Sequence, residues 1–304
     1  MTVIPPAAAD RAPAKKPPGG PRSVVLRALL RNKLAVLALA VLALLLVAAL
    51  FAPLIAPYDP NTQDLLIRLR PPAWQDGGTG AHLLGTDQLG RDMLSRVIHG
   101  ARVSLLVGAG AALLAGVIGT AVGLAAGYFG GWADRTLMRL ADVQLAFPSL
   151  LLALAVVGFL GSGLWLVVLV LGFTGWVSYA RVVRSEVMSL RTRDFITEAR
   201  AIGVTDVTIM RRHLLPNVMA PLATIGTLHV AAAIVAEASL SYLGLGVPKE
   251  TVTWGAMLAD GQLYLGTSWW VAVFPGIALM LTSLAINITG DALRDVADPK
   301  AYRR

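Results

Sequence analysis

Long apolar stretches without a charged residue constrain this chain more than any other feature. Residues 143–180 contain no Asp, Glu, Lys or Arg over 38 positions. As one helix they would extend roughly 57 Å, whereas the hydrocarbon core of a bilayer is about 30 Å thick. Only 14% of the 304 residues are charged, against about 25% in soluble domains. The chain has too little charge to cover a soluble surface, so the sequence predicts an integral membrane protein.

Six membrane-spanning helices account for the apolar stretches and predict an all-α, polytopic fold. The run Leu34–Ile55 has 22 uncharged residues, which is enough for one crossing and too long for the apolar region of a secretory signal. The break Gly161-Ser162-Gly163 divides the 38-residue stretch into two spans. The expected spans are 34–55, 103–127, 143–160, 164–181, 216–237 and a sixth within 261–290 that begins near Trp269.

The distribution of basic residues predicts the side of the membrane on which each connection lies. Six spans place both ends of the chain on one side, together with segments 128–142 and 181–217. That side carries 20 Lys and Arg residues, and the other side carries 6. Because positive charge accumulates in cytoplasmic connections, both termini are expected in the cytoplasm. This topology explains the net charge of +8, so no nucleic-acid partner is expected.

Polar and proline-rich segments divide the chain into five parts. Residues 1–33 are rich in Pro, Ala, Lys and Arg and have few side chains that could pack, which predicts a disordered tail. In order, we expect a cytoplasmic tail 1–33, a first span with its N-terminal extension 34–60, an external segment 61–102, a core of five spans 103–293 with a cytoplasmic loop 185–217, and a cytoplasmic tail 294–304.

Three glycines in the second span predict close helix packing. Gly119, Gly123 and Gly127 recur every four residues and therefore share one face of a helix. Small residues at this spacing let two helix backbones approach each other. A groove that faces a ligand is the alternative interpretation.

Two other features of the spans suggest positions relative to the membrane. His229 falls inside the fifth span, where it is expected as a hydrogen-bonded interior residue or as a substrate or proton site. The pair Trp269-Trp270 at the start of the sixth span is typical of an interfacial aromatic anchor.

Several kinds of catalytic site are absent from the sequence. It has no G-x-x-x-x-G-K-[ST] phosphate loop, no H-E-x-x-H metal motif and no G-x-S-x-G nucleophile turn. We therefore expect no catalytic residue, no metal site and no cofactor, and we do not expect an enzyme. A stand-alone secondary transporter is an alternative, but it would need acidic residues inside the spans. A membrane-embedded enzyme would need clustered polar residues there.

The cytoplasmic loop 185–217 predicts two short helices joined at a glycine. Asp194 is expected to cap the first helix, and Gly203 to end it in a left-handed turn. Thr205 is expected to cap the second helix, and Pro216 marks the return to the membrane. Such a helix pair suits a groove on another protein, and a solvated basic loop is the alternative.

This loop resembles the EAA loop of ABC-importer permeases, whose pattern is E-A-A-x-x-x-G, nine residues, then I-x-L-P. The matching positions are Ala199, Gly203, Leu215 and Pro216. The sequence departs from the pattern at Thr197, which stands at the family's glutamate, and at Glu198, which stands at its first alanine. The resemblance implies that these residues couple the chain to an ATPase, with Glu198 either replacing the glutamate or merely solvated.

Further segments resemble one branch of that family, the C-type subunits of dipeptide, oligopeptide and nickel importers. The resemblance covers roughly residues 22–300. A late segment that matches contains Glu237 and Trp254. The branch's GTD…GRD segment corresponds to Gly85, Thr86, Asp87, Gly90, Arg91 and Asp92.

The resemblance implies a fold, a function and a set of partners. It implies a type I-like importer permease fold in a prokaryotic plasma (inner) membrane, with peptides as the transported solutes. Nickel or another non-peptide solute is the alternative within the family. The implied partners are a second homologous permease subunit, two cytoplasmic ATPase subunits, an extracytoplasmic binding protein and the lipid bilayer.

The outer motifs each have two physical interpretations. The GTD…GRD segment could form an outer turn that caps a helix leading into Ser104, or it could contact a binding protein. Glu237 lies 22 residues beyond Leu215, roughly 33 Å along a helix, which places it near the outer mouth of a pathway. There Glu237 could pair structurally, or it could contact the solute together with Trp254.

Overall fold

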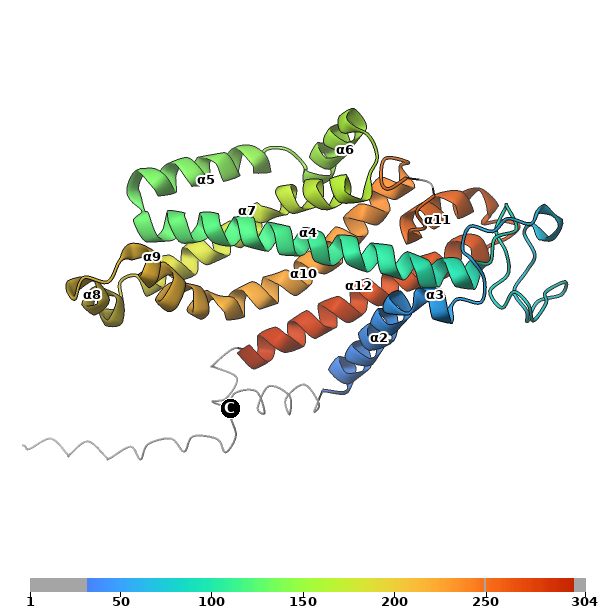
Figure 1. The fold of residues 1–304 in the computed structure, drawn as a ribbon, viewed down its shortest axis with the longest axis horizontal. Helices are drawn as coiled ribbons and strands as arrows, with labels where there is room; N and C mark the ends of the chain where they lie inside the picture. The colour runs from blue at the N-terminus through green and yellow to red at the C-terminus, as the bar shows by residue number, and fades with distance from the viewer. Residues whose placement is uncertain (1–31, 249, 298–304) are drawn as a thin grey trace, which may run out of the picture.

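Helices form nearly all of the regular structure in the computed structural model, which describes residues 32–248 and 250–297. Within these residues, the one exception is an isolated bridge between Thr86 and Asp92. The predicted all-α fold is thereby confirmed. The longest helices run side by side along the molecule (Figure 1): α2 (Lys33–Leu50), α4 (Met93–Phe129), α7 (Leu164–Leu190), α10 (Leu215–Tyr242) and α12 (Trp270–Ala297).

Five helical stretches among the described residues are long and apolar enough to cross a membrane. A sixth crossing is reached only if the bent pair α5 (Gly131–Leu145) and α6 (Ser149–Leu160) counts as one span. The third span, expected over 143–160, is therefore a bent pair of helices that meet at 81°. Pro148 stands at the break, where it disfavours helical geometry at the preceding residue. Helix α6 alone has 12 residues and reaches only about 18 Å.

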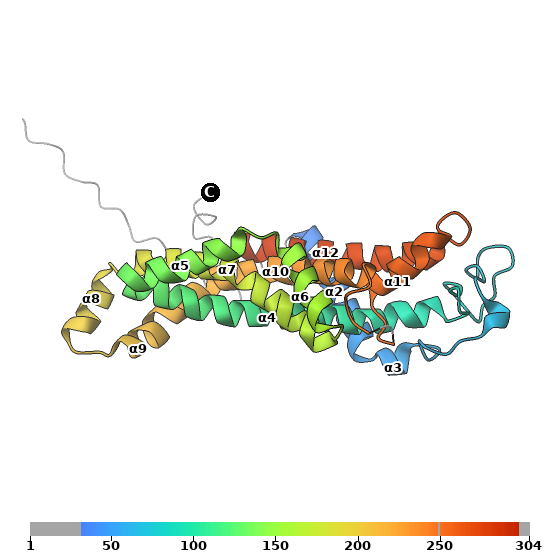
Figure 2. The same cartoon turned by 90° about the horizontal axis from the view of Figure 1, so that it is seen from above.

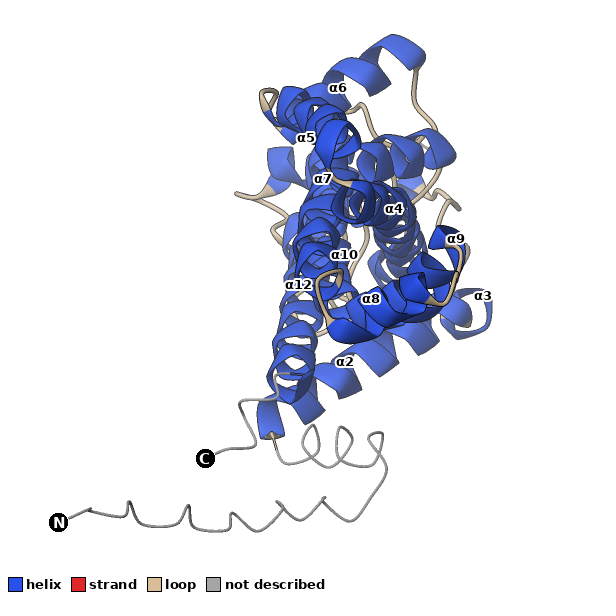
Figure 3. Cartoon of the chain, turned by 90° about the vertical axis from the view of Figure 1, so that its left-hand side faces the viewer, coloured by secondary structure: helices blue, strands red, loops and turns tan. Residues whose placement is uncertain are grey.

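The shorter elements gather at the two ends of the bundle (Figures 1 and 2). One end carries the helix pair that follows α7, and the opposite end carries the long segment between α3 and α4. Seen along the length of the molecule, α5 and α6 lie at one edge of the bundle and α2 at the other (Figure 3). The short helices are α3 (Ala52–Ile55), η1 (Leu65–Ile67), α8 (Asp194–Ala201), α9 (Asp206–Ile209), the π-helical turn η2 (Met210–Leu214), α11 (Trp254–Gly261) and η3 (Gln262–Tyr264).

The glycine face of α4 packs directly against α7, as predicted. A Cβ added at Gly119 would lie 2.4 Å from the Trp176 carbonyl oxygen, and one added at Gly123 would lie 2.6 Å from that of Ala180. Gly127 meets α7 one turn further on. The absence of side chains at these three positions is what lets the two backbones come so close.

Helix α12 begins differently from the expectation. Trp270 is buried, and its indole Nε1–H donates a hydrogen bond of 3.0 Å to the carbonyl oxygen of Thr86. The predicted interfacial anchor is therefore wrong for Trp270, which joins α12 to the external segment instead. A buried indole needs such a partner for its N–H. The expected tails 1–33 and 294–304 lie largely outside the described residues.

Candidate functional site

The turn between α8 and α9 has the geometry that the sequence predicts. Gly203 has a φ of +82°, which is the left-handed conformation that glycine adopts without strain. The N–H of Val204 donates to the Ala199 carbonyl, and the N–H of Gly203 donates to the Arg200 carbonyl, both at 3.0 Å. These two bonds form a Schellman motif, which satisfies the last carbonyls of α8 and fixes the direction in which the chain leaves it.

The inner face of this helix pair belongs to the core of the molecule. Ile196, Ile209 and Leu214 are fully buried. They share one apolar cluster with Val187 of α7 and Val218 of α10. Because buried apolar contacts of this kind move together, the helix pair is firmly attached to two membrane-spanning helices.

A polar network ties the same helix pair to the end of α4. The Arg200 guanidinium lies 4.7 Å from the centre of the Tyr128 ring, and its Nε–H donates to the Tyr128 hydroxyl at 3.2 Å. That hydroxyl in turn donates to the carboxylate of Asp206. No role for these three residues was predictable from local sequence, although Tyr128 directly follows the predicted glycine face near the end of α4.

The residues of the predicted loop motif are divided between the surface and the core. Thr197, Glu198 and Pro216 are exposed, Ala199 is buried and Leu215 is half-buried. The expected cap at Asp194 is wrong by one position: Arg193 occupies the cap without a side-chain hydrogen bond, and Asp194 lies in the first turn. Thr205 does occupy a cap position, but its hydroxyl pairs with that of Thr208.

Two large apolar side chains lie exposed on either side of Gly203. Ile202 is 81% exposed and Val207 is 68% exposed, at the end of the molecule formed by α8 and α9 (Figure 2). Ile202 ends α8, which has 8 residues and is too short to cross a membrane, and Val207 lies at the start of the helical stretch Asp206–Tyr242, ahead of Arg211 and Arg212. Exposed apolar side chains that stand together outside a core are typical of a protein-binding surface.

At the other end of the molecule, the GTD…GRD segment folds around a buried ionic network. Asp87 is 2% exposed and accepts a hydrogen bond of 2.6 Å from the guanidinium of Arg91. Arg96 lies 3.5 Å from the same carboxylate. Asp260 of α11 lies 3.2 Å from Arg91 and completes the network. Asp260, which stands just before the last charge-free stretch, was not predicted from the sequence.

The rest of this segment forms the cap and turns that lead into α4. The Asp92 carboxylate accepts hydrogen bonds from the backbone N–H of Ser95 at 2.8 Å and from its hydroxyl at 2.7 Å. Gly85 and Gly90 have φ values of +79° and +73°, so each turn requires a glycine. Thr86 is fully buried. Because the motif's side chains face inward, their arrangement matches the structural role that was one of the two interpretations.

Glu237 and Trp254 are both fully buried. The Glu237 carboxylate accepts a hydrogen bond of 2.7 Å from the Ser241 hydroxyl and one of 3.4 Å from that of Ser104 on α4. The Trp254 indole donates to the Val97 carbonyl at 3.0 Å. These contacts favour structural pairing for Glu237 over direct contact with a solute.

Comparison with known proteins identifies the fold and the family. A family model described as "Binding-protein-dependent transport system inner membrane component" matches residues 119–303, more than half of the chain. The chain belongs to this family. A second model, "N-terminal TM domain of oligopeptide transport permease C", matches residues 20–72, which include the first apolar run. Between the two matches lies the segment 73–118, which includes most of α4.

Individual relatives are similar to this chain over most of their length. The chain is 45% identical to the di/tripeptide transport system permease protein of Pseudomonas aeruginosa over 269 residues, covering 88% of this chain and 89% of that one. It is 41% identical to the glutathione transport system permease protein of Pectobacterium atrosepticum, covering 90% and 89%. The chain is therefore a multi-pass inner-membrane permease subunit of an ABC importer.

A solved structure supports the same fold. The inward-facing MetNI methionine ABC transporter superposes with a TM-score of 0.52 at 21% identity. The match covers 67% of this chain and 97% of that chain. At this identity the likeness concerns the fold, and it confirms the predicted importer-permease architecture.

Proposed function

We propose that this permease subunit, with a second homologous permease subunit, encloses a path by which short peptides enter the cytoplasm. The names of two similar permeases support this substrate class, since one carries di- or tripeptides and the other glutathione, a peptide. Nickel or another non-peptide solute is the alternative within the family. An extracytoplasmic binding protein would deliver the solute at the end that carries the segment 56–92 between α3 and α4.

Two cytoplasmic ATPase subunits that dock on α8 and α9 would supply the energy for transport. The observation that carries this assignment is the pair of exposed apolar residues Ile202 and Val207, which flank the glycine turn on a helix pair with a buried inner face. Burial of apolar side chains is the dominant favourable contribution to most protein–protein association. Glu198 is exposed beside them and is available to an ATPase groove.

The docked helices would pass motion to the membrane-spanning part of the subunit. ATP binding would close the ATPase pair and displace α8 and α9. Because Ile196 and Ile209 are packed in one cluster with α7 and α10, these spans would rock with them and open the path alternately to each side. No covalent bond is made or broken in this chain, so it has no catalytic residue of its own.

The docking assignment is tested by placing charges on the exposed pair. The double variant Ile202→Glu with Val207→Glu should insert normally, because both side chains are exposed, but should retain ATPase subunits at least about tenfold less well on co-purification. Leu66→Glu is the matched control, since Leu66 is 93% exposed at the opposite end of the molecule. Equal ATPase recovery from the double variant and the control would refute the docking site.

An experiment on the purified chain alone distinguishes a stand-alone transporter from the proposed permease subunit. In proteoliposomes under a proton or sodium gradient, the isolated subunit should take up no dialanine, and with ATP it should release no phosphate. Gradient-driven uptake would favour the secondary transporter, and ATP hydrolysis by the single subunit would overturn the permease assignment.

A further inference from the structure

Three hollows lie along one side of α10, and each shares lining residues with the next. The first, about 460 Å³, lies between α7, α10 and α12 and is lined by Thr224 and Leu228. The second, about 440 Å³, lies between α6, α10 and α12 and shares Leu228 with it. The third, about 220 Å³, lies between α6, α7 and α10 and shares Leu150, Ala232 and Ala236 with the second. We call these three neighbouring hollows together the α10 groove.

The α10 groove occupies one face of the helix, and a separate hollow occupies the other. Thr224, Leu228 and Ala232 are spaced by four residues and therefore share a face. A hollow of about 720 Å³ between α4 and α10 is lined by Ala223. Ala223 and Ala232 are separated by about two and a half helical turns, so their side chains point in opposite directions. Both alanines are exposed.

Polarity distinguishes the two faces. Apart from Thr120, Tyr179 and Thr227, the lining of the hollow between α4 and α10 is apolar, as suits lipid or a packed apolar partner. Polar side chains facing lipid are costly, and ionisable residues inside spans face a water-filled cavity or a partner. The α10 groove has many such side chains, namely Ser178, Glu186, His229, Ser283, Asn287 and Arg294.

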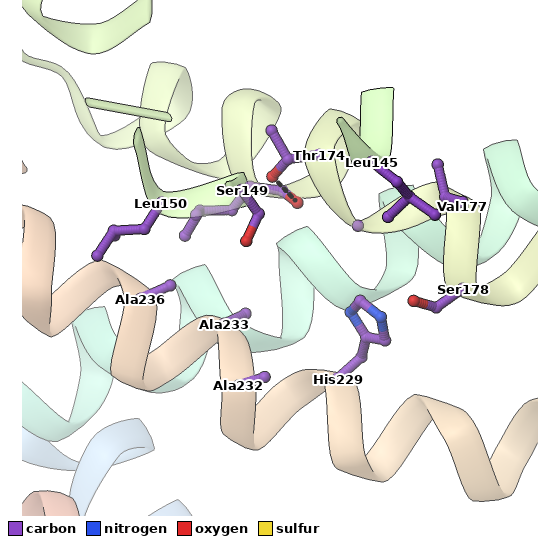
Figure 4. A pocket seen from close by; sticks show the side chains of 12 residues that line it. Leu145, Ser149, Leu150, Thr174, Val177, Ser178, His229, Ala232, Ala233 and Ala236 are labelled. Atoms are coloured by element: carbon purple, nitrogen blue, oxygen red, sulfur yellow. Dashed lines mark hydrogen bonds between the residues drawn. The ribbon is translucent and has the colours of Figure 1, made fainter. Parts of the chain in front are cut away.

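The Nδ1–Cε1 edge of the His229 ring faces Gly175 of α7, and both residues line the third hollow (Figure 4). The His229 ring lies 4.7 Å from the ring of Tyr179, measured between centroids. A Cβ at Gly175 would lie only 2.9 Å from His229 Cε1, so the glycine leaves room for the imidazole. Ser149 and Ser178 point into the same hollow, and no hydrogen bond joins them to His229 among the residues drawn.

An unsatisfied hydroxyl lies in the wall of the second hollow. Ser283 Oγ is buried and has no hydrogen-bond partner in the described part of the chain, although it lines the second hollow. Buried polar atoms normally have a partner. Ser149, Ser178 and His229 add further side-chain donors and acceptors to the lining of the α10 groove.

We propose that the α10 groove is this subunit's part of the solute path, and that His229, Ser149 and Ser178 form a contact site for the backbone of a short peptide within it. The peptide part of the proposal rests on the proposed function. A peptide backbone and its terminal carboxylate offer both acceptors and donors, which a neutral imidazole and two hydroxyls complement. The small residues Ala232 and Ala236 leave room for peptide side chains of different shapes.

Cysteine labelling of the assembled transporter tests the groove without reference to any solute. The natural chain has no cysteine, so Ala232→Cys and Ala223→Cys each introduce one thiol on opposite faces of α10. In membranes that contain the complete complex, a water-soluble cationic thiol reagent should modify Ala232→Cys on the order of tenfold faster or more, because thiols in apolar surroundings stay protonated and unreactive. Equal rates, or faster modification of Ala223→Cys, would overturn the assignment of the groove.

The contact site is tested by uptake of radiolabelled dialanine by the complete complex. His229→Ala should raise the KM by about tenfold, as the loss of one hydrogen bond to a charged group predicts, and His229→Asn should recover part of the loss. Thr120→Ala, in the opposite hollow, should leave the KM unchanged. An unchanged KM in His229→Ala would refute the contact site. If the natural complex carries no dialanine, the peptide assignment fails, and the labelling rates still decide the groove.

Discussion

At Gly203, one backbone angle decides whether α8 can turn into α9. Its φ is +82°, and an added Cβ would meet no heavy atom within 4 Å. A substitution is therefore opposed by backbone conformation and not by crowding. We expect Gly203→Val to cost about 1–2 kcal/mol of local strain. ATPase co-purification and peptide uptake should fall, while the amount of inserted subunit stays near normal, because the spans bury their apolar surface elsewhere.

Gly203→Asn is the matched control for this prediction. Asparagine tolerates the left-handed conformation far better than valine does, and the space around the turn is open. The Asn variant should therefore keep most of its ATPase association. If Gly203→Val retains association and transport as fully as the Asn variant does, α8 and α9 are not the coupling element.

The residues that sequence could identify are those whose role depends on the local chain. The left-handed turn at Gly203 was predictable because glycine between two capped helices has few other uses. The ion pair between Arg91 and Asp260 was not, because the two residues are 169 positions apart and only the folded chain brings them together. Trp270 was misjudged for the same reason: its partner is the distant carbonyl of Thr86.

Between elements, the ionic network around Asp87 holds the external segment to α4 and α11. Asp87→Asn would leave Arg91 and Arg96 buried with reduced compensation, since they are only 8% and 3% exposed. Removing one partner of a buried ion pair costs about 3–5 kcal/mol. We expect a clearly lower thermal unfolding midpoint for the purified subunit in detergent, and faster proteolysis between α3 and α4.

Asp260→Asn shows how much of the loss of stability in Asp87→Asn depends on burial of the carboxylate. The Asp260 side chain is 43% exposed, and pairs that reach solvent contribute about 1 kcal/mol or less. Its unfolding midpoint should therefore shift much less than that of Asp87→Asn. Equal shifts in the two variants would show that burial of the carboxylate does not determine its contribution.

Element boundaries were predictable where apolar runs end in polar residues, and unpredictable where a run is broken from within. The span expected over 143–160 is uniformly apolar, and Phe147-Pro148 does not interrupt its hydropathy. The proline nevertheless ends the helical path and turns α6 away from α5 by 81°. Hydropathy reports whether a segment avoids water, whereas its direction depends on backbone geometry.

For the whole molecule, the arrangement of helices decides what each face of α10 does. Both faces carry exposed alanines, Ala223 and Ala232, so residue type alone does not separate them. The α10 groove exists because α6 and α12 leave space beside one face. The bend at Pro148 helps to create this space. Hydropathy does not reveal the bend, so it could not have predicted the groove.

The orientation of the whole subunit is the last expectation, and it rests on the bias of 20 to 6 basic residues between the two sides. The ends of the molecule carry distinct exposed markers: Asp76 lies in the external segment, and Thr205 lies between α8 and α9. Because the natural chain has no cysteine, Asp76→Cys and Thr205→Cys each report one position. In intact cells, a membrane-impermeant thiol reagent should modify only Asp76→Cys, and permeabilisation should expose Thr205→Cys equally. Modification of Thr205→Cys in intact cells would reverse the proposed orientation and, with it, the side on which an ATPase could dock.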